Sequence, residues 1–402
     1  MKPSGAFAAN RRTLFLSPEP PFPTIGGGPI RSASLFEYLS ERSQVDVITF
    51  RQSGDPDPRE RFPPGRAHHI YVVDLPVHSK SAPARVLRNL KRAVHSRPPL
   101  MDRFSGFAAE IGRAIAGQQY DWALIEHFWC AEYEPLLRTH CKQVYLDLHN
   151  IESRWHAKLA DTENQAVGLI YRRFAQASEK LERELFPRFD ALLVTSDADG
   201  KRVLAIAPEA KCVIFPNALP YLQKPIRPER NSIVFSGNLE YQPNVSAVRY
   251  FRNSIWPSVR ERCPLLSWEI IGKNPHSITG IVQGDDRIRI IGPVDDAVTA
   301  IAGAAVAVVP LLAGSGTRIK ILEAWAAATA VVSTSIGAEG LDYRSGDNLM
   351  IADDPSGFSE SVVSLVGSAD RRQSLGLSGR KHYEESYTWG NAFAELDRNL
   401  TC

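Results

Sequence analysis

Short apolar runs alternate with longer amphipathic stretches from the start of the chain. Arg12–Ser17 and Val45–Phe50 are apolar runs of strand length, and Pro29–Glu41 between them spaces its apolar residues as a helix does. A run bounded by turn residues is typical of a buried strand, whereas three- and four-residue spacing indicates a helix. The order strand, helix, strand predicts a βαβ unit with a parallel sheet.

The same alternation continues to residue 215. Further strands are predicted at Ile70–Leu75, Trp122–Glu126, Val144–Leu148, Ala191–Thr195 and Cys212–Phe215. Helices are predicted at Ala84–His95, Phe104–Ala116, Glu132–Thr139, Glu152–Leu185 and Asp199–Ile206. Prolines at positions 216, 220, 225 and 228 then indicate a linker.

A second alternating region follows the linker. Its strands are predicted at Ser232–Ser236, Trp268–Ile271, Ile288–Ile291, Val306–Val309, Val331–Thr334 and Leu349–Ile351. Its helices are predicted at Asn244–Arg260, Asp296–Ile301, from near Thr317, and at Ser356–Gly367, Asp370–Glu384 and Trp389–Asn399. We therefore expect an α/β protein of two doubly wound Rossmann-like domains, residues 1–215 and 216–386, facing a central cleft where a ligand binds. Residues 387–402 should form a helix that packs back toward the N-terminal domain.

Composition narrows the class of protein. The net charge of +2 gives no electrostatic case for nucleic-acid binding. Five scattered cysteines without a CxxC pair argue against a zinc site and a disulfide framework, and favour a reducing cytoplasm. The first residues lack the apolar region of a secretory signal. The uncharged stretch Ala297–Thr317 is broken by Pro310 and changes period, so we expect a helix and a buried strand there rather than a membrane span.

The stretch Val306–Glu323 holds the first candidate site. A small-residue loop, Gly314-Ser315-Gly316, lies between a predicted strand and a predicted helix. Such a loop lets a ligand approach the backbone, and the helix N-terminus behind it attracts anions. Arg318 and Lys320 lie in the first turn, where the helix dipole disfavours cations, which indicates a bound phosphate. The same pattern is explained equally well by an ordinary turn and an ion pair between Lys320 and Glu323 on the helix surface.

Other candidates lie where predicted strands end. Gly26-Gly27-Gly28 joins the first strand to a helix with Arg31 in its first turn, and polar pairs follow two later strands, at Glu126-His127 and His149-Asn150. In the second region Gly237, Gly272 and Gly292 follow three strands directly. Ligands bind at this edge of open α/β sheets. A histidine there can act as a base, bind a hydroxyl or be purely structural.

The predicted helix Ala84–His95 is basic and amphipathic. Val86, Leu87, Leu90 and Val94 share one side, with basic residues around them. Such a helix can rest on an anionic membrane surface. A solvated helix face is an equally good interpretation.

Several enzyme classes are excluded by missing motifs. The chain has no GxxxxGK[ST], no GxGxxG, no GxSxG and no HExxH. The acidic pairs Asp285-Asp286, Asp295-Asp296 and Asp353-Asp354 are typical of turns and helix caps rather than of metal sites.

Taken in order, several motifs resemble the family-4 glycosyltransferases of the two-domain GT-B fold over nearly the whole chain. They are Pro20-Pro21, Gly26–Gly28 and Arg31; Asp147–Asn150; Ser236–Asn238 with Pro243-Asn244; Ile271-Gly272 with Pro275; Gly292–Val294; Pro310–Ala326; Val331–Leu341; and Tyr387–Trp389.

The resemblance implies retaining, metal-independent transfer of a sugar from a nucleotide-diphosphate sugar, with no other cofactor. The C-terminal domain would hold the donor, and the N-terminal domain a glycan or lipid-linked acceptor. His149, Arg318 and Lys320 would be the catalytic residues. Substrate binding would involve Gly26, Gly27, Gly28, Arg31, His127, Asn150, Gly237, Asn238, Gly272, Val294, Gly314, Ser315, Gly316, Thr317 and Glu323.

The chain departs from the family pattern at two places. Many members carry two glutamates eight positions apart; Glu323 matches the second, and Ser315 stands at the first. Many also have an Arg and a Lys after the first strand of the second domain, where this chain has Gly237–Glu240. The resemblance therefore implies that Gly316, Arg318 and Lys320 hold the diphosphate, whose charge grows as the donor bond breaks.

Two other functions stay open on sequence grounds. A non-hydrolysing nucleotide-sugar epimerase has the same two-domain architecture, and a non-catalytic nucleotide-sugar-binding protein would need the same loops. For the preferred glycosyltransferase we expect a bacterial, cytoplasmic protein of polysaccharide or glycolipid synthesis, with possible peripheral contact at the inner face of the membrane.

Overall fold

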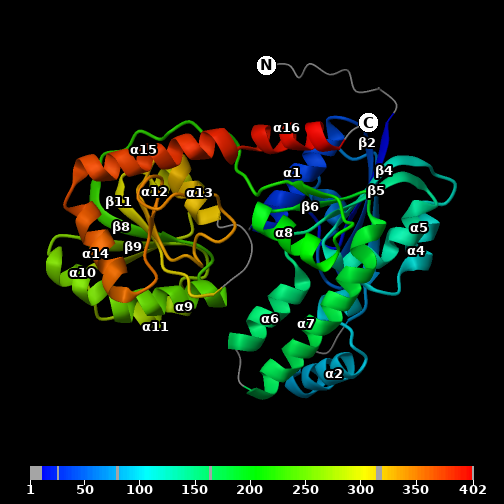
Figure 1. Cartoon of the computed structure of the whole chain (residues 1–402), viewed down its shortest axis with the longest axis horizontal. Coiled ribbons are helices and arrows are strands. Elements are labelled where there is room, and N and C mark those ends of the chain that lie inside the picture. The colour runs from blue at the N-terminus through cyan, green and yellow to red at the C-terminus, as the bar shows by residue number, and fades with distance from the viewer. Residues whose placement is uncertain (1–10, 25–26, 78–80, 163–164, 314–318, 401–402) are drawn as a thin grey trace. The chain divides into compact units, whose positions relative to one another are not determined.

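The computed structural model describes residues 11–24, 27–77, 81–162, 165–313 and 319–400. Contacts within the chain divide it into two units. The first comprises Met1–Phe215 and Glu395–Cys402, and the second comprises Pro216–Ala394. Each unit holds one parallel sheet with helices packed on it, as Figure 1 shows. The predicted α/β class with two Rossmann-like sheets is confirmed.

The sheet of the first unit has seven strands in the order β3-β2-β1-β4-β5-β6-β7. They are β1 Arg12–Ser17, β2 Gln44–Gln52, β3 His69–Leu75, β4 Tyr120–Glu126, β5 Cys141–Asp147, β6 Ala191–Val194 and β7 Cys212–Ile214. The order turns back between β1 and β4, which is where open α/β sheets bind ligands. The last residues of β4 and β5, Glu126 and Asp147, are register partners and so lie side by side at this edge.

The helices of the first unit are α1 Gly27–Ser40, α2 Ala82–Val94, α3 Pro99–Phe104, α4 Ala108–Ala114, α5 Glu134–Arg138, α6 Glu152–Thr162, α7 Gln165–Leu185 and α8 Asp197–Ile206. Three predicted helices need correction. The helix expected over 104–116 is interrupted by Gly106, whose φ of 88° breaks the helical path. The helix expected from Glu132 begins as a 3₁₀ turn, Phe128–Tyr133, and turns α-helical where Pro135 enters.

The single helix predicted over 152–185 is two helices, α6 and α7, that pack against each other (Figure 1). Nδ1 of His156 on α6 lies 3.1 Å from Oγ of Ser178 on α7. The backbone N–H of Ser153 donates to Glu182 at 2.9 Å. The apolar spacing continues across the break, so the pattern alone could not reveal that the second half folds back onto the first.

The sheet of the second unit has six strands in the order β10-β9-β8-β11-β12-β13. They are β8 Arg230–Ser236, β9 Ser267–Ile271, β10 Ile288–Gly292, β11 Ala304–Val309, β12 Val331–Ser333 and β13 Met350–Ile351. The helices are α9 Gln242–Tyr250, α10 Trp256–Arg262, α11 His276–Val282, α12 Ala297–Ile301, α13 Ile319–Ala326, α14 Pro355–Val366, α15 Ala369–Ser386 and α16 Trp389–Asn399.

Two helices of the second unit differ from expectation. The helix predicted over 244–260 contains a π-helical segment, Phe251–Ile255, just before Pro257. Proline has no N–H to continue the regular ladder, and the wider turn accommodates that loss. The short helix α11 is absent from the prediction, because Gly280 and β-branched residues weaken the helical signal there.

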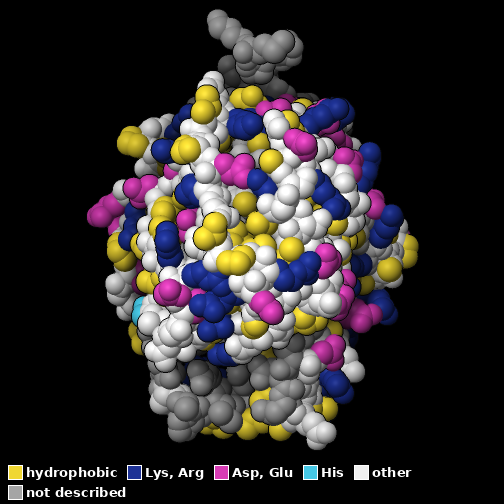
Figure 2. Space-filling view, turned by 90° about the vertical axis from the view of Figure 1, so that its left-hand side faces the viewer, with side chains coloured by type: hydrophobic (Ala, Val, Ile, Leu, Met, Phe, Trp, Pro, Cys, Tyr) yellow, Lys and Arg dark blue, Asp and Glu magenta, His cyan; other side chains and the backbone are white. Residues whose placement is uncertain are grey.

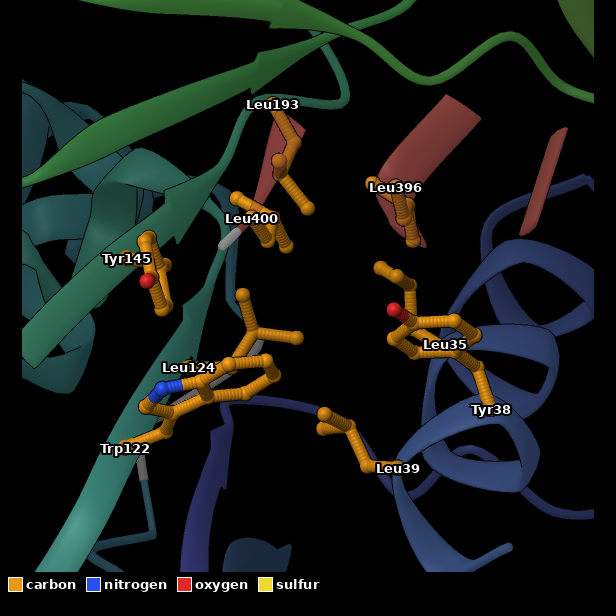
Figure 3. A pocket seen from close by; sticks show the side chains of 9 residues that line it. All are labelled: Leu35, Tyr38, Leu39, Trp122, Leu124, Tyr145, Leu193, Leu396 and Leu400. Carbon is orange, nitrogen blue, oxygen red and sulfur yellow. The ribbon is translucent and has the colours of Figure 1, made fainter. Parts of the chain in front are cut away.

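The end of α16 belongs to the first unit. Figure 3 shows Leu396 and Leu400 of this C-terminal segment facing a small apolar pocket. The other lining residues come from α1 and the sheet: Leu35, Tyr38, Leu39, Trp122, Leu124, Tyr145 and Leu193. Tyr38 also donates a hydrogen bond of 2.7 Å to Asp397. Apolar burial and this polar contact together hold the segment on α1.

In the described part of the chain, no helix is both long and apolar enough to cross a membrane. On the face that Figure 2 shows, basic and acidic side chains are interspersed.

Gly237 and Gly272, which directly follow β8 and β9, lie against each other. We therefore expect one added methyl group at this point to destabilise the second unit. A Cβ added at Gly272 would lie 1.7 Å from the carbonyl oxygen of Gly237. Gly272→Ala should therefore lower the unfolding free energy of the second unit by about 2 kcal/mol or more. The measurement is the urea midpoint, followed by circular dichroism.

Gly280→Ala is the matched control, because a Cβ there meets nothing within 4 Å. It lies inside α11, where alanine should stabilise by roughly 0.5–1 kcal/mol. Equal midpoints for Gly272→Ala and the unchanged protein would contradict the close approach.

Candidate functional site

A charged cluster lies at the ligand edge of the first sheet. We call Glu126, Asp147, His149 and Arg31 the strand-end cluster. Glu126 and Asp147 end their strands, and their side chains are 0% exposed. The N–H of His127 donates to the Asp147 carbonyl at 3.0 Å, which ties the two strand ends together beyond the sheet.

Arg31 reaches this cluster from the fifth position of α1, which begins at Gly27. It is 1% exposed, and its Nε donates to Oδ2 of Asp147 at 2.8 Å. Its Nη1 donates to the carbonyl of Phe215 at 2.6 Å, and its guanidinium lies 4.6 Å from the centre of the Phe215 ring. The sequence analysis noted Arg31 as a cation near a helix N-terminus and a candidate for substrate binding. In the structure, the anion that Arg31 binds is the carboxylate of Asp147. The contact of Arg31 with substrate stays a prediction.

His149 lies on the other side of Asp147. Its Nε2 is 3.1 Å from Oδ2 of Asp147 and 3.9 Å from Oε1 of Glu126. Neither contact has hydrogen-bond geometry, so both Nε2 and Oε1 are buried atoms without a hydrogen-bond partner among the described residues. Burial alone would lower the pKa of His149, but the two carboxylates outweigh it and raise the pKa to about 9. The ring is therefore an imidazolium at neutral pH and cannot accept a further proton.

His127 has the opposite electrostatic character. It is 9% exposed, and its ring stacks on His149 with the centroids 3.6 Å apart. It also stacks on Trp129, with the ring centroids 4.1 Å apart. Burial and then the positive charge of His149 hold the pKa of His127 well below its ordinary value. Its φ of 59° is unusual for a residue with a side chain, and such backbone strain is found at functional sites.

Two more residues border the cluster. A Cβ added at Gly28 would lie 3.9 Å from Nδ1 of His149, which places this glycine beside the imidazolium. Trp129 donates from Nε1 to Glu152 at 2.9 Å. Burial raises the pKa of Glu152 to about 7. Asn150, which follows His149, is partly exposed.

Lys320 and Asn244 form a polar contact at the corresponding edge of the second sheet. Nζ of Lys320 donates to Oδ1 of Asn244 at 2.7 Å. The same ammonium lies 4.5 Å from the centre of the Phe235 ring, within cation–π range. A Cβ at Gly237 would come within 3.1 Å of Nζ and 2.8 Å of Nδ2 of Asn244. A side chain at position 237 would therefore crowd both Lys320 and Asn244.

Glu323 lies one turn further along α13. Ser236, the last residue of β8, donates to it over 3.4 Å. Burial raises the pKa of Glu323 to about 7, although the Lys320 charge opposes the shift. A carboxylate in this state is poorly hydrated and can accept two hydroxyl groups when ionised.

The other predicted residues of the second unit lie around this edge. The N–H of Gly272 donates to Gly292 at 2.8 Å, and that of Gly237 donates to Ile271 at 3.0 Å. Asn238 is exposed, and its carbonyl accepts from Asn244 at 2.8 Å. Val294 is partly buried against the core.

Some predicted residues lie outside the described part of the chain: Gly26, Gly314, Ser315, Gly316, Thr317 and Arg318. Their roles stay predictions. Gly27 is described as the first residue of α1.

Two groups of described side chains have the composition of a metal site. Glu126, Asp147 and His149 form one, and Asp46, His68 and His69 the other. In the first group the Arg31 guanidinium already neutralises Asp147, and the raised pKa of His149 disfavours the neutral ring that a metal needs. In the second group Oδ2 of Asp46 is bound by Arg12 and Tyr120. Each donor set is therefore already engaged by cations or donors of the protein.

Sequence reasoning missed two partners. Asp147 and Asn244 both occur inside quoted motifs, but neither was assigned to the site, whereas Glu126 was named with His127 as a candidate pair at the strand end. The signal for Asn244 is its position after Pro243 at the start of α9, close to a glycine-ended strand. The pairing of Asp147 with Arg31, 116 positions away, has no local signal.

Comparison with known proteins agrees with this architecture. Residues 230–368 match the family described as "Glycosyl transferases group 1". A Klebsiella pneumoniae protein with the name "Uncharacterized 44.6 kDa protein in cps region" is 23% identical over 401 residues, which cover 96% of this chain and 98% of that one.

Three solved structures resemble the whole chain. Sucrose-phosphate synthase from Thermosynechococcus elongatus has a TM-score of 0.72 at 16% identity, covering 97% of this chain and 98% of its own. Anabaena HepE, solved with UDP and glucose, has a TM-score of 0.64 at 11% identity, covering 97% and 99%. A variant of TarM from S. aureus, solved with fondaparinux, alpha-GlcNAc-glycerol and UDP, has a TM-score of 0.67 at 9% identity, covering 98% and 100%.

The fold is that of the GT-B glycosyltransferases. The segment that matches group 1 glycosyltransferases begins at the first residue of β8 and extends past α14. It therefore contains Gly237, Asn244, Lys320 and Glu323.

The raised pKa of His149 predicts a pH dependence of stability. The folded protein holds this proton up to about pH 9, whereas the unfolded chain releases it near 6.5. The unfolding free energy should therefore fall by about 2 kcal/mol between pH 7 and pH 9. Urea midpoints at pH 7, 8 and 9 measure this.

His149→Gln should flatten the dependence above pH 7. His140→Gln is the matched control, since His140 lies at the opposite end of β5 and should leave the dependence intact. A slope that survives in His149→Gln would contradict the charge assigned to this ring.

Proposed function

We propose that the protein is a retaining, metal-independent glycosyltransferase. It moves a sugar from a nucleotide-diphosphate sugar to a glycan or lipid-linked acceptor. One observation carries the proposal: inside the segment that matches group 1 glycosyltransferases, Lys320 and Glu323 share one face of α13 beside the glycine end of β8. A cation and a partly buried carboxylate one helical turn apart suit a diphosphate and a ribose, respectively.

Lys320 serves the diphosphate. As the bond to the sugar breaks, negative charge grows on the departing phosphate, and a fixed cation nearby lowers the energy of that state. Asn244 and the Phe235 ring hold the ammonium in one place, so little reorganisation is needed. Arg318, two positions earlier, is proposed to add a second positive charge.

Glu323 serves the ribose. Its carboxylate is partly buried and receives one long hydrogen bond from Ser236, so two ribose hydroxyls could bind it. Gly272 and Val294 follow neighbouring strands and are proposed to border the nucleotide. HepE and TarM, which share this fold, were solved with UDP.

His149 serves the sugar or the acceptor as a positive charge and hydrogen-bond donor, because its imidazolium has no lone pair for a proton. The stacked, neutral His127 and the amide of Asn150 are proposed to bind hydroxyls beside it. Fixed cations of the protein would stabilise the negative charge on the departing diphosphate, as a bound metal ion does in other enzymes. For this reason we propose a metal-independent reaction.

Donor binding tests the role of Lys320. A nucleotide-sugar at a hundred times its dissociation constant should stabilise the protein by about 2.7 kcal/mol, and a thermal-shift panel should find one that does. Lys320→Gln should weaken that donor at least tenfold, since it removes the cation and keeps a polar hydrogen-bonding side chain. Lys381→Gln, an exposed lysine on α15, is the matched control and should bind normally.

Equal donor affinity in Lys320→Gln would overturn the assigned role. Conversion of the donor to another nucleotide-sugar without an acceptor would favour an epimerase instead.

The raised pKa of Glu323 predicts how donor affinity depends on pH. A carboxylate that accepts ribose hydroxyls must be ionised, and in the free protein it becomes so only as the pH rises through about 7. The dissociation constant of a nucleotide-sugar should therefore fall severalfold between pH 6 and pH 8. Titration calorimetry at both values measures it.

Glu323→Gln should bind the donor more weakly and lose this pH dependence. Glu339→Gln, also in the second unit, is the control. Unchanged pH dependence in Glu323→Gln would contradict the assignment.

A further inference from the structure

Helix α2 presents its apolar side to the outside of the protein. Leu87, Leu90 and Val94 share one side of the helix, and they are 70%, 47% and 75% exposed. Val77, five residues before the helix begins, is 79% exposed. A helix on a globular protein ordinarily buries this side in the core.

The basic side of α2 faces the protein instead. Nε of Arg92 lies 2.7 Å from Oδ2 of Asp102 in α3, and the Arg92 side chain is only 12% exposed. Arg88 and Asn89, on the same side, are partly buried. An ion pair therefore fixes the helix in the orientation that leaves its leucines outside.

The same segment is strongly positive. Residues 82–97 contain Arg85, Arg88, Lys91, Arg92 and Arg97 and no acidic residue. Lys91 is exposed and lies one turn from Leu87. On the face in Figure 2, by contrast, charges of both signs are interspersed.

The neighbouring helix extends the apolar character. Figure 1 shows α2 beside α7, and the two helices are in contact. Leu169, near the beginning of α7, is 64% exposed. Exposed apolar residues on two contacting helices mark an interaction site more firmly than scattered single residues do.

We propose that α2 is a docking surface for an anionic lipid bilayer. The apolar side chains would enter the boundary between headgroups and acyl chains, and Lys91 would keep its ammonium at the phosphates. The charge decides between this occupant and a second copy of the chain, because two copies would bring the same positive segment together. The proposal does not depend on the donor site, which lies in the other unit.

Vesicle co-sedimentation with the full chain tests the proposal. Vesicles with one third phosphatidylglycerol should bind the protein at least tenfold more strongly than pure phosphatidylcholine vesicles, and the difference should shrink as salt rises from 0.05 to 0.5 M. The triple variant Leu87→Gln, Leu90→Gln, Val94→Gln should lose at least tenfold in affinity for the anionic vesicles. Lys91→Glu should lose severalfold.

Leu265→Gln is the matched control, because Leu265 is 84% exposed and lies in the second unit. It should bind vesicles normally. Circular dichroism and nucleotide-sugar binding should be unchanged in every variant, which separates this test from that of the proposed function.

Three results would overturn the proposal. They are absence of binding to anionic vesicles, equal binding by the triple variant, and a dimer in light scattering that the triple variant abolishes. The last would assign the surface to a second copy of the chain.

Discussion

The burial of Asp147 between Arg31 and His149 constrains the whole first unit. A carboxylate that is 0% exposed needs fixed positive partners, and removal of one partner of such a group typically costs about 3–5 kcal/mol. Arg31 ties α1 to the end of β5, and through the carbonyl of Phe215 it also holds the backbone just after β7. His149 supplies the second positive charge, so its protonation is set by the packing of the sheet edge.

This constraint also shapes the chemistry available at the edge. Asp147 and Glu126 keep His149 charged, while burial and then the charge of His149 hold the pKa of the stacked His127 well below its ordinary value. The second unit shows a related arrangement with the opposite sign, where burial favours the protonated form of Glu323 beside the ammonium of Lys320. At the edge of each sheet, burial therefore shifts the pKa of a titratable group: it dominates at Glu323, whereas at His149 the neighbouring carboxylates outweigh it. The proposed transfer needs such groups, since charge moves from the sugar bond to the departing phosphate.

Much of the fold could be predicted because local hydrophobic periodicity and turn residues determine where most strands and helices lie. Periodicity and turn residues predict the strands of both sheets and the linker. They also predict that Gly237, Gly272 and Gly292 lie at strand ends. Helix continuity was less predictable: the apolar spacing of 152–185 fits one long helix, whereas α6 and α7 pack on each other through contacts such as those of His156 with Ser178 and Ser153 with Glu182. The orientation of α2 could not be predicted either. Its amphipathic pattern shows an apolar and a basic side, but the side that faces the protein depends on the ion pair of Arg92 with Asp102 in α3.

The candidate site was predictable to the same extent. Lys320, Glu323, His127 and His149 were found because they follow strands or begin a helix. Their partners were not, since Asp147 and Asn244 meet Arg31 and Lys320 from 116 and 76 positions away. The resemblance to a family supplied the order of the motifs, and the structure supplied the contacts that set the charge of each group.

The most direct test is the release of nucleoside diphosphate from a panel of nucleotide-sugars, in the presence of candidate acceptors and of EDTA, with the product's anomeric configuration read by NMR. The account predicts that one donor is consumed, that the transferred sugar keeps its configuration, and that Lys320→Gln is inactive. Binding of nucleotide-sugars with no release for any donor and acceptor, or a product of inverted configuration, would contradict it.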